Sequence, residues 1–401
     1  MCHSLVPHIN MQLIIILISI LLFTFYAALL IYYRAAWKTI PNFKPQTSNF
    51  KLATSISIII PARNEEQNLP LLLKGILEQS YDKNLFEVIV IDDHSTDNTA
   101  YIVKQFTGID IKLIQLKDHV PDSGINSYKK KAIEIAIAQS NAELIVTTDA
   151  DCIVPKNWLE TIAAFYVQTG AAFIVMPVSF SCRNNFLEIF QALDFMTLQG
   201  ITGAAVHKNA SSMCNGANLA YSKKAFDAVE GFKGINDIAS GDDMLLMHKI
   251  YRQYPDGIKY LRSREVIVQT APMHNWKDFL NQRIRWASKA DKYDDKRIFA
   301  VLLLVYLFNL LLLLLSVTIL FYNPMLSIIN CQLSIVNFWL LLIALKTITE
   351  LFFLYPVSVF FQKQRLLWVF PIAQPFHVVY TVIAGWLGKF GTYKWKDRKV
   401  K

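Results

Sequence analysis

The sequence has little of what a zinc site or a disulfide framework requires. No two cysteines form a Cys-x-x-Cys pair, and their spacing follows no regular pattern: Cys2, Cys152, Cys182, Cys214 and Cys331. The histidines that we considered as ligands are scattered without ligand spacing, and we assign no site to them: His94, His207, His248 and His274. These absences agree with a reducing compartment and argue against structural zinc and redox chemistry.

Charge is also missing from long stretches of the chain. No charged side chain occurs from Asn10 to Tyr33, a stretch long enough for a helix to cross a bilayer core. The block is too long for the apolar part of a cleaved signal peptide, no cationic segment precedes it and no Ala-x-Ala site follows it. We therefore expect residues 1–34 to form a retained transmembrane anchor.

A second apolar region covers residues 298–390 and has room for about two to three further spans. Three residues interrupt it and predict a hairpin of spans near 299–322 and 335–361: Asn323, Pro324 and Asn330. In the second span, Lys346 and Glu350 stand four residues apart, so they share a helix face and can pair. Such a pair is either structural or lines the path of an acceptor.

The last apolar piece, Leu366 to Gly388, precedes a basic tail at residues 391–401. It contains prolines and polar residues: Pro371, Gln374, Pro375 and His377. A plain span would export the basic tail, against the positive-inside rule. We therefore expect a re-entrant or interfacial piece, with a true span as the alternative.

The charged residues carry a formal net charge of +9. Four cations follow the first span, whereas no Lys or Arg precedes it: Arg34, Lys38, Lys44 and Lys51. The positive-inside rule then places the soluble part in the cytoplasm, on a multi-pass protein of the inner (cytoplasmic) membrane. Because the cations gather beside apolar spans and not with aromatics on one soluble stripe, we expect a membrane partner and no nucleic acid.

Residues 52–297 read as one α/β domain that ends in an interfacial helix at 274–297. Apolar strands alternate with helical stretches, as in "SISIIIP", which we expect to stop at Pro61, "FEVIVID", "IKLIQL" and "ELIVTT". This order predicts a doubly wound, mostly parallel sheet, and such sheets bind ligands beyond the carboxyl ends of their strands. The polar residues at those ends should line one crevice: Arg63, Asn64, Asp92, Asp93, Asp149 and Asp151.

The Asp-x-Asp of "TTDADC" places Asp149 and Asp151 where both can face one hard cation, with water and phosphate oxygens completing its shell. We therefore predict Mg²⁺ or Mn²⁺ holding a diphosphate. The alternative is that the two aspartates cap a helix that starts near Lys156. Two further acidic pairs favour a site over a cap: Asp92 with Asp93, and Asp242 with Asp243.

Five motifs occur in the order typical of one enzyme family: "PARNEE", "VIDDHSTDNT", "TTDADC", "SGDDMLL" and "QRIRW". Over residues 55–290 and the flanking spans, the chain resembles the membrane-bound members of the family 2 inverting glycosyltransferases. The resemblance implies a GT-A fold. It also implies transfer of a sugar from a nucleotide-sugar donor, a UDP-sugar, to a lipid or lipid-linked acceptor at the cytoplasmic membrane face.

The resemblance also implies roles for individual residues. The donor would be bound by Pro61, Arg63, Glu65, Asp92, Asp93 and Lys129, and the metal and diphosphate by Asp149 and Asp151. Relatives usually have a glycine-lysine pair at the position of Lys129. Here "SYKKKAI" has tyrosine in place of the glycine and three lysines that compete for the role.

For catalysis, the resemblance makes Asp243 the general base, with Asp242 standing where many relatives have glutamate and remaining the other candidate. The acceptor or diphosphate would be contacted by Gly216, Asn218, Gln282, Arg283, Arg285 and Trp286. The helix that carries "QRIRW" has an alternative interpretation as a membrane-surface anchor. "WKDR", Trp395 to Arg398, resembles a tail signature of membrane relatives, with no role that we can derive.

Two other functions compete with single sugar transfer. A processive polysaccharide synthase shares "QRIRW" but usually needs more spans for an export channel. A non-enzymatic membrane receptor with a receiver-like domain would leave "SGDD" and "QRIRW" without purpose. The sugar itself is not encoded in a motif, because the shape of the pocket decides it.

Overall fold

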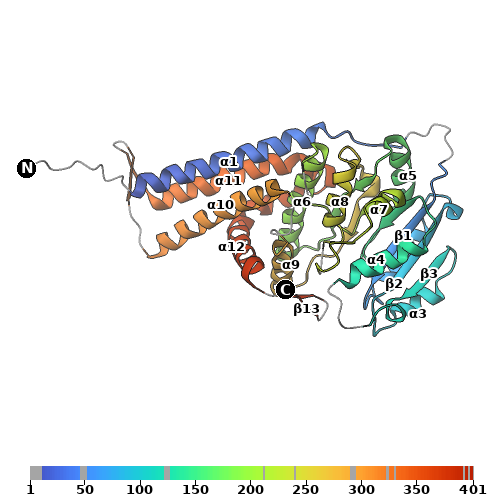
Figure 1. Ribbon diagram of the computed structural model, residues 1–401. Helices are drawn as coiled ribbons and strands as arrows, with labels where there is room; N and C mark the ends of the chain where they lie inside the picture. The colour runs from blue at the N-terminus through green and yellow to red at the C-terminus, as the bar shows by residue number, and fades with distance from the viewer. Residues whose placement is uncertain are drawn as a thin grey trace, which may run out of the picture. The chain divides into compact units, whose positions relative to one another are not determined.

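The computed structural model describes residues 11–45, 52–121, 127–210, 213–238, 241–289, 295–321, 325–328, 331–391, 393–395 and 398–400. The chain divides into two compact units (Figure 1). An α/β unit contains Ala36–Asn275 and Lys394–Val400, and a helical unit contains Met1–Ala35, Trp276–Tyr393 and Lys401. Residues of the sequence analysis that lie outside the described parts include Cys2, Lys51, Asn323, Pro324, Asn330, Lys396 and Asp397.

A seven-stranded sheet forms the centre of the α/β unit, in the order β3-β2-β1-β4-β7-β5-β8. Its strands are β1 (Ile56–Ala62), β2 (Phe86–Asp92), β3 (Ile111–Gln115), β4 (Leu144–Thr147), β5 (Phe173–Val175), β7 (Leu219–Ser222) and β8 (Ile258–Tyr260). Neighbouring strands are parallel except where β7 runs antiparallel to β4 and β5. The predicted mostly parallel sheet is confirmed.

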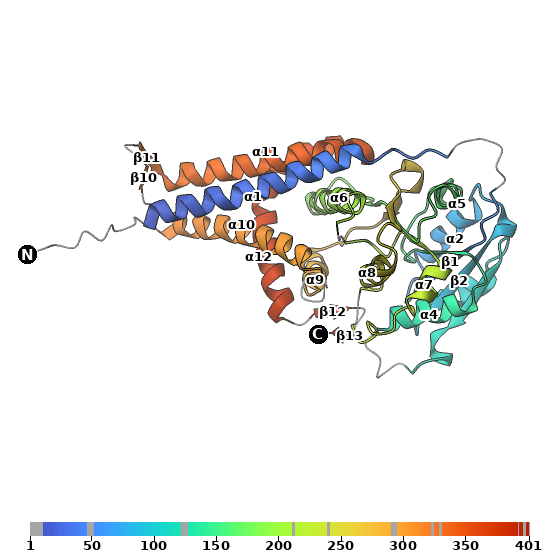
Figure 2. The ribbon, with the colours of Figure 1, turned by 45° about the horizontal axis from the view of Figure 1, so that its top comes forward.

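The sheet forms because its central strands are apolar along their whole length. Ile58, Ile59 and Ile60 of β1 are fully buried, as are Val88 to Ile91 of β2, so both faces of these strands must be covered. The chain moves outward from β1 to β3 and returns to β4. Right-handed crossovers therefore put α2 (Leu69–Leu77) and α3 (Thr99–Gln105) on one face and α4 (Tyr128–Gln139) on the other (Figure 2).

Pro61 does not end the first strand, as the sequence analysis expected. Pairing with β2 continues to Pro61 opposite Ile91 and Ala62 opposite Asp92. On the other side, pairing with β4 stops at Ile59 opposite Thr147. The strand is therefore paired on only one side at Pro61, and a residue without an N–H group is tolerated there.

The remaining elements of the α/β unit follow the sheet. They are α5 (Trp158–Thr169), α6 (Phe186–His207), α7 (Lys223–Ala228), α8 (Met244–Gln253) and the parallel pair of β6 (Val178–Phe180) and β9 (Val268–Thr270). Arg262 holds the start of the unit: its Nη1 donates to the carbonyls of Trp37 (3.2 Å) and Ile40 (2.9 Å). Gly203 has to be glycine, because a Cβ there would lie 2.8 Å from both the Trp37 and Tyr260 rings.

Four helices of the structure are long and apolar enough to cross a membrane: Leu13–Thr39, Lys296–Phe321, Ile335–Phe361 and Gln364–Phe390. They correspond to α1 (Met11–Thr39), α10 (Lys296–Phe321), α11 (Ile335–Phe361) and α12 (Phe370–Phe390) with the 3₁₀ turn η5 (Gln364–Val369). One N-terminal and three C-terminal apolar helices agree with the predicted number. The strands β10 (Met325–Ile328) and β11 (Cys331–Ser334) pair between α10 and α11.

The last apolar piece is a continuous helix despite its prolines. Pro371 stands in the first turn of α12, where its missing N–H costs nothing, and Pro375 lies inside the helix. By length and composition the segment qualifies as a span, which was the alternative to the expected re-entrant or interfacial piece. The helix α9 (Trp276–Ala287), predicted at 274–297, belongs to the helical unit and packs on α12.

Candidate functional site

The loops that follow β1 and β2 are bonded to each other along their length. The Asn64 amide oxygen accepts from the Thr96 backbone N–H at 2.8 Å, and the Asn64 N–H donates to the Ser95 hydroxyl at 3.0 Å. Glu66 and Asp97 continue the pattern, since the Glu66 N–H donates to an Asp97 carboxylate oxygen at 3.0 Å. The predicted nucleotide-binding loops therefore form one preorganised edge.

Three of the predicted donor-binding residues meet at this edge. Arg63 Nη1 donates to the Asp93 carbonyl at 3.1 Å and lies 3.7 Å from the Asp93 carboxylate. Asp93 also lies 3.0 Å from the His94 ring, and Asp92 accepts from the Ser95 N–H at 3.0 Å. Asp92 and Asp93 are both buried, so neither is a solvated surface charge. Pro61 lies near the end of β1, and Glu65 lies in the loop that follows it, where its carboxylate accepts from Asn68 at 2.9 Å.

A second group of predicted residues converges on Lys129. Its ammonium, at the start of α4, lies 2.7 Å from Asp149, which follows β4, and 3.1 Å from Asp242, which precedes α8. Burial works to lower the pKa of Lys129, but the carboxylates of Asp149, Asp242 and Asp243 outweigh it and raise the pKa. Lys129 thus stays positively charged between carboxylates from two distant parts of the chain.

Gly216 lies against this group, and the geometry explains why it is glycine. Its N–H donates to the Asp243 carboxylate at 3.2 Å. A Cβ at this position would lie 3.2 Å from Asp242 Oδ2 and 3.3 Å from Lys129 Nζ. Such contacts would force the ion pair apart by a few tenths of an ångström, so the close approach of backbone and charges depends on the missing side chain.

The helix-cap alternative fails for Asp149 and Asp151, whereas Asp243 is a cap that the sequence analysis did not predict. Asp243 is the N-cap of α8, and its Oδ1 accepts from the Met244 N–H at 2.7 Å. Asp149 and Asp151 cap nothing, because α5 begins at Trp158 with Asn157 in the cap position.

Asp151 is exposed and turns toward Thr270, whose hydroxyl donates to it at 3.3 Å. Among the described residues, no three His, Cys, Asp or Glu side chains are arranged to hold a metal ion. Two carboxylates are hard ligands and would occupy only part of the coordination shell of Mg²⁺ or Mn²⁺. A diphosphate and water would complete that shell. The neighbouring Cys152 is no ligand, since burial and the two carboxylates raise the pKa of its thiol.

Asn218 has a different place from the one predicted. It is fully buried, and its amide bonds three protein groups: it accepts from Trp158 Nε1 at 2.9 Å and donates to the carbonyls of Pro177 (2.8 Å) and Val266 (2.7 Å). A direct contact with a sugar or acceptor would break these bonds. The structure therefore corrects the predicted contact, and Asn218 supports the site by fixing β7 against its neighbours.

The three lysines of "SYKKKAI" have three different environments. Lys129 lies among the carboxylates, whereas Lys131 is exposed and bonds Glu134 at 2.7 Å. Lys130 is buried, and its ammonium donates to the carbonyls of Ile235 (2.5 Å) and Ile238 (2.7 Å), just before the Asp242–Asp243 segment. The sequence did not indicate this supporting role, because a lysine on an α/β helix is normally solvated.

The "QRIRW" residues lie on α9 in the helical unit. Arg283 is buried, with its guanidinium 4.6 Å from the Phe279 ring and 4.3 Å from the Trp286 ring. It also donates to the Gln282 amide oxygen at 2.5 Å. Arg283 therefore contributes to the packing of α9, and Gln282, Arg285 and Trp286 remain the predicted contacts to acceptor or diphosphate.

Comparison with known families agrees with this arrangement. The profile described as "Glycosyl transferase family 2" matches residues 57–229, from β1 to the end of α7. The profile "Glycosyl transferase family group 2" matches residues 144–385, which is more than half of the chain. The chain belongs to glycosyltransferase family 2. The predicted family is confirmed.

Two curated glycosyltransferases illustrate the breadth of the family. The probable glycosyltransferase YdaM of Bacillus subtilis is 26% identical over 64% of this chain and 59% of its own length. The beta-monoglucosyldiacylglycerol synthase of Synechocystis is 26% identical over 58% of this chain and 47% of its own. The chain thus spans only about half the length of these two relatives.

A solved glycosyltransferase structure shares the fold. It is the mannosyltransferase PcManGT of Pyrobaculum calidifontis, solved with GDP-Man and Mn²⁺. The match covers 91% of this chain and 99% of the PcManGT chain. The TM-score is 0.57 at 19% identity. This similarity assigns the GT-A fold to the α/β unit, as predicted.

Replacing Lys129 by methionine should weaken the binding of UDP about tenfold or more, because a hydrogen bond to a charged group contributes about 1.5–3 kcal/mol. Lys131→Met, one of its neighbours on α4, should change the Kd less than about twofold, since its exposed ion pair contributes about 0–1 kcal/mol. Calorimetric titration with UDP measures both. Equal effects of the two substitutions would refute a role for Lys129 in the site.

Asn218→Ala should lower the free energy of unfolding by about 3 kcal/mol, because it leaves buried donors and acceptors without partners. Thermal unfolding in detergent, followed by tryptophan fluorescence, measures the loss. Asn157→Ala is the control: its amide makes an exposed bond to Glu265 at 2.9 Å, and its loss should cost about 0.5 kcal/mol or less. Similar unfolding temperatures for the two variants would contradict the structural role of Asn218.

Proposed function

We propose that the protein is an inverting glycosyltransferase that moves one sugar from a nucleotide-sugar donor, a UDP-sugar, to a lipid or lipid-linked acceptor at the cytoplasmic face of the membrane. The observation that carries the proposal is the convergence of Lys129, Asp149, Asp242 and Asp243 around Gly216 in a family 2 chain.

The nucleotide would lie across the carboxyl ends of β1 and β2. Arg63 and the two bonded loops offer a charged edge there, and Asp92 and Asp93 offer carboxylates to a ribose or base. The diphosphate would reach toward Lys129 and Asp149. An ammonium partly shielded from water binds a diphosphate more strongly than a solvated one does.

Asp149 and Asp151 would hold the divalent cation in this proposal. When bound, Mg²⁺ or Mn²⁺ offsets the charge that develops on the leaving diphosphate. The Mn²⁺ in the structure of PcManGT supports this assignment for a protein of the same fold. The chain's own contribution is to keep the two carboxylates at one strand end, with Asp149 oriented by Lys129 and Asp151 by Thr270.

Asp243 is the proposed general base, and the environment of Asp242 supports that choice. Asp242 is paired with the Lys129 ammonium at 3.1 Å, so its carboxylate is already engaged with a cation. An Asp243 oxygen would accept the proton of the acceptor hydroxyl while the hydroxyl oxygen bonds to the anomeric carbon of the sugar. The bond from this carbon to the diphosphate oxygen would break on the opposite face, which inverts the configuration.

A lipid acceptor fits the four apolar helices. The name of the Synechocystis relative, a beta-monoglucosyldiacylglycerol synthase, gives a lipid product for one member of the family. Arg34, Lys38 and Lys44 follow the first apolar stretch and favour a cytoplasmic α/β unit. A panel of UDP- and GDP-sugars, offered with diacylglycerol, monoglycosyl-diacylglycerol or polyprenyl phosphate, would identify the substrates, and product length on gels would separate single transfer from processive synthesis.

Asp243→Asn should lower sugar transfer by about 10³-fold or more while UDP binding changes less than about twofold. Asparagine is as good an N-cap as aspartate and keeps an oxygen for the Met244 N–H, so the loss reports the missing base and not a frayed α8.

The matched control for this test is Asp82→Asn, the same change at another capping aspartate, which accepts from the Asn84 N–H at 3.0 Å in the turn before β2. Transfer by this variant should be unchanged. If Asp243→Asn turns over at the normal rate, the base assignment is wrong, and Asp242→Asn tests the alternative.

Removal of divalent cations with EDTA should abolish transfer, and Mg²⁺ or Mn²⁺ should restore it. Binding of UDP should also weaken without the cation, which calorimetry measures without turnover. Asp149→Ala and Asp151→Ala should raise the cation concentration needed for half-maximal UDP binding by about tenfold. Cation-independent binding of UDP to the unaltered protein would remove the metal from the proposal.

A further inference from the structure

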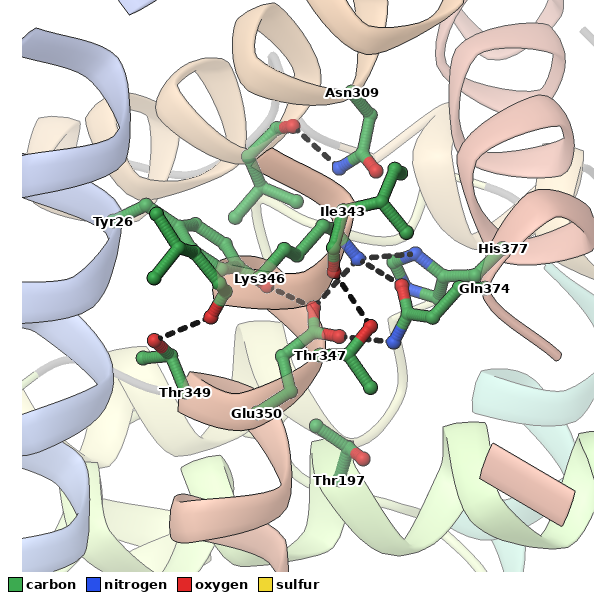
Figure 3. Close-up of polar contacts among 12 residues, drawn as sticks. Tyr26, Thr197, Asn309, Ile343, Lys346, Thr347, Thr349, Glu350, Gln374 and His377 are labelled. Atoms are coloured by element: carbon green, nitrogen blue, oxygen red, sulfur yellow. Dashed lines mark hydrogen bonds and ion pairs between the residues drawn. The ribbon is translucent and has the colours of Figure 1, made fainter. Parts of the chain in front are cut away.

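A cluster of polar side chains lies among the apolar helices of the helical unit (Figure 3). Lys346 of α11 is fully buried, and its ammonium lies 2.7 Å from Glu350, 2.7 Å from the Gln374 amide oxygen of α12 and 3.4 Å from His377 Nδ1. Glu350 in turn accepts from the hydroxyl of Tyr26 on α1 and from the Gln374 amide. The cluster therefore joins α1, α11 and α12.

The cluster makes a poor ligand site. The Lys346 ammonium is surrounded by three polar side chains, and both carboxylate oxygens of Glu350 accept hydrogen bonds. A lipid phosphate or an ion would have to displace these buried partners. Ionised groups in an apolar setting are costly, and replacing both by apolar residues is often neutral for stability. The presence of this charged pair is therefore better explained by a role that an apolar pair could not fill.

Aromatic contacts lead from the cluster to α9. The His377 ring packs edge-on against Tyr380 at 5.3 Å, and Tyr380 packs edge-on against Phe279 of α9 at 5.1 Å. The Arg283 guanidinium lies over the Phe279 ring, 4.6 Å from its centroid. Phe376, the residue before His377 on α12, stacks on Trp276 of α9 at 5.6 Å.

The far end of α9 approaches α12 even more closely. A Cβ on Gly388 would lie 2.7 Å from the Ala287 Cβ, so only glycine permits the contact. The helix α9 is therefore held in its first turn by Phe376 and Tyr380 and at its last residue by Gly388. Every contact in this series lies within one compact unit.

We propose that the cluster of Lys346, Glu350 and Gln374 is a positioning device for sugar transfer. It fixes the rotation and depth of α12 against α11, and α12 in turn fixes α9, which presents Gln282, Arg285 and Trp286. The polar bonds can form in only one register, whereas apolar helix faces can slide past each other. The inference rests on the proposed function, since it assigns to these α9 side chains a part in binding the acceptor.

The test compares variants of the full-length protein in lipid nanodiscs. The main variant, Lys346→Met with Glu350→Met, removes both charges together and leaves no unpaired ion. Glu350→Gln leaves the Lys346 ammonium without its counterion. Thr349→Val is the control on the same helix, because the Thr349 hydroxyl bonds only its own helix, at the Leu345 carbonyl (2.8 Å).

Two readouts are needed, and one does not depend on activity. Hydrogen–deuterium exchange of the peptide that covers α9 should accelerate about tenfold in the double variant and stay unchanged in Thr349→Val. With the lipid of the acceptor panel that the unaltered protein uses best, the KM for that lipid should rise about tenfold or more, with kcat changed less than about threefold. The Kd for UDP should stay within about twofold.

Several results would overturn the inference. Unchanged exchange of α9 in the double variant would show that the cluster does not hold this helix. Faster exchange with an unchanged KM would show that its position does not matter for transfer. Loss of UDP binding as well would reveal a role in folding as a whole. If the unaltered protein transfers no sugar from any donor, the proposed function fails, while the exchange measurement still decides whether the cluster anchors α9.

Discussion

Mutual repulsion of carboxylates is the constraint on which the candidate site depends. Asp149, Asp242 and Asp243 come from two distant parts of the chain, and two unit charges about 4 Å apart repel by roughly 4 kcal/mol at the effective dielectric of a protein surface. The Lys129 ammonium, 2.7 Å from Asp149 and 3.1 Å from Asp242, offsets that repulsion. Gly216 is then required because no side chain fits between the charges.

The protein uses two lysine-centred ion clusters in different ways. Lys129 is only partly shielded from solvent, and two carboxylates lie within 3.1 Å of its ammonium. Lys346 is fully buried, and Glu350, Gln374 and His377 surround its ammonium. The first arrangement suits exchange of partners when a charged ligand binds, whereas the second suits permanent attachment of helices. The degree of burial separates a binding group from a structural one.

The sequence predicts those parts of the fold that local patterns determine. Buried strands such as Ile56–Ala62 and Phe86–Asp92 follow from their continuous apolar runs, and the pairing of Lys346 with Glu350 follows from a spacing of four residues. The antiparallel insertion of β7 between β4 and β5 depends on pairing between distant segments, which no local pattern contains. The same reason hides the contacts of Lys130 and Asn218, whose partners lie far away in the chain.

Asp243 combines the proposed role of general base with that of a helix cap, which the sequence analysis did not predict. The Met244 N–H occupies one acceptor position on Oδ1, and the Gly216 N–H occupies one on Oδ2. An ionised carboxylate has about four such positions, so two remain for an acceptor hydroxyl. The two backbone donors hold the carboxylate in one orientation, and a base that is already oriented loses no reorganisation energy when the proton transfers. In the proposed reaction, capping α8 is therefore how the chain orients its base.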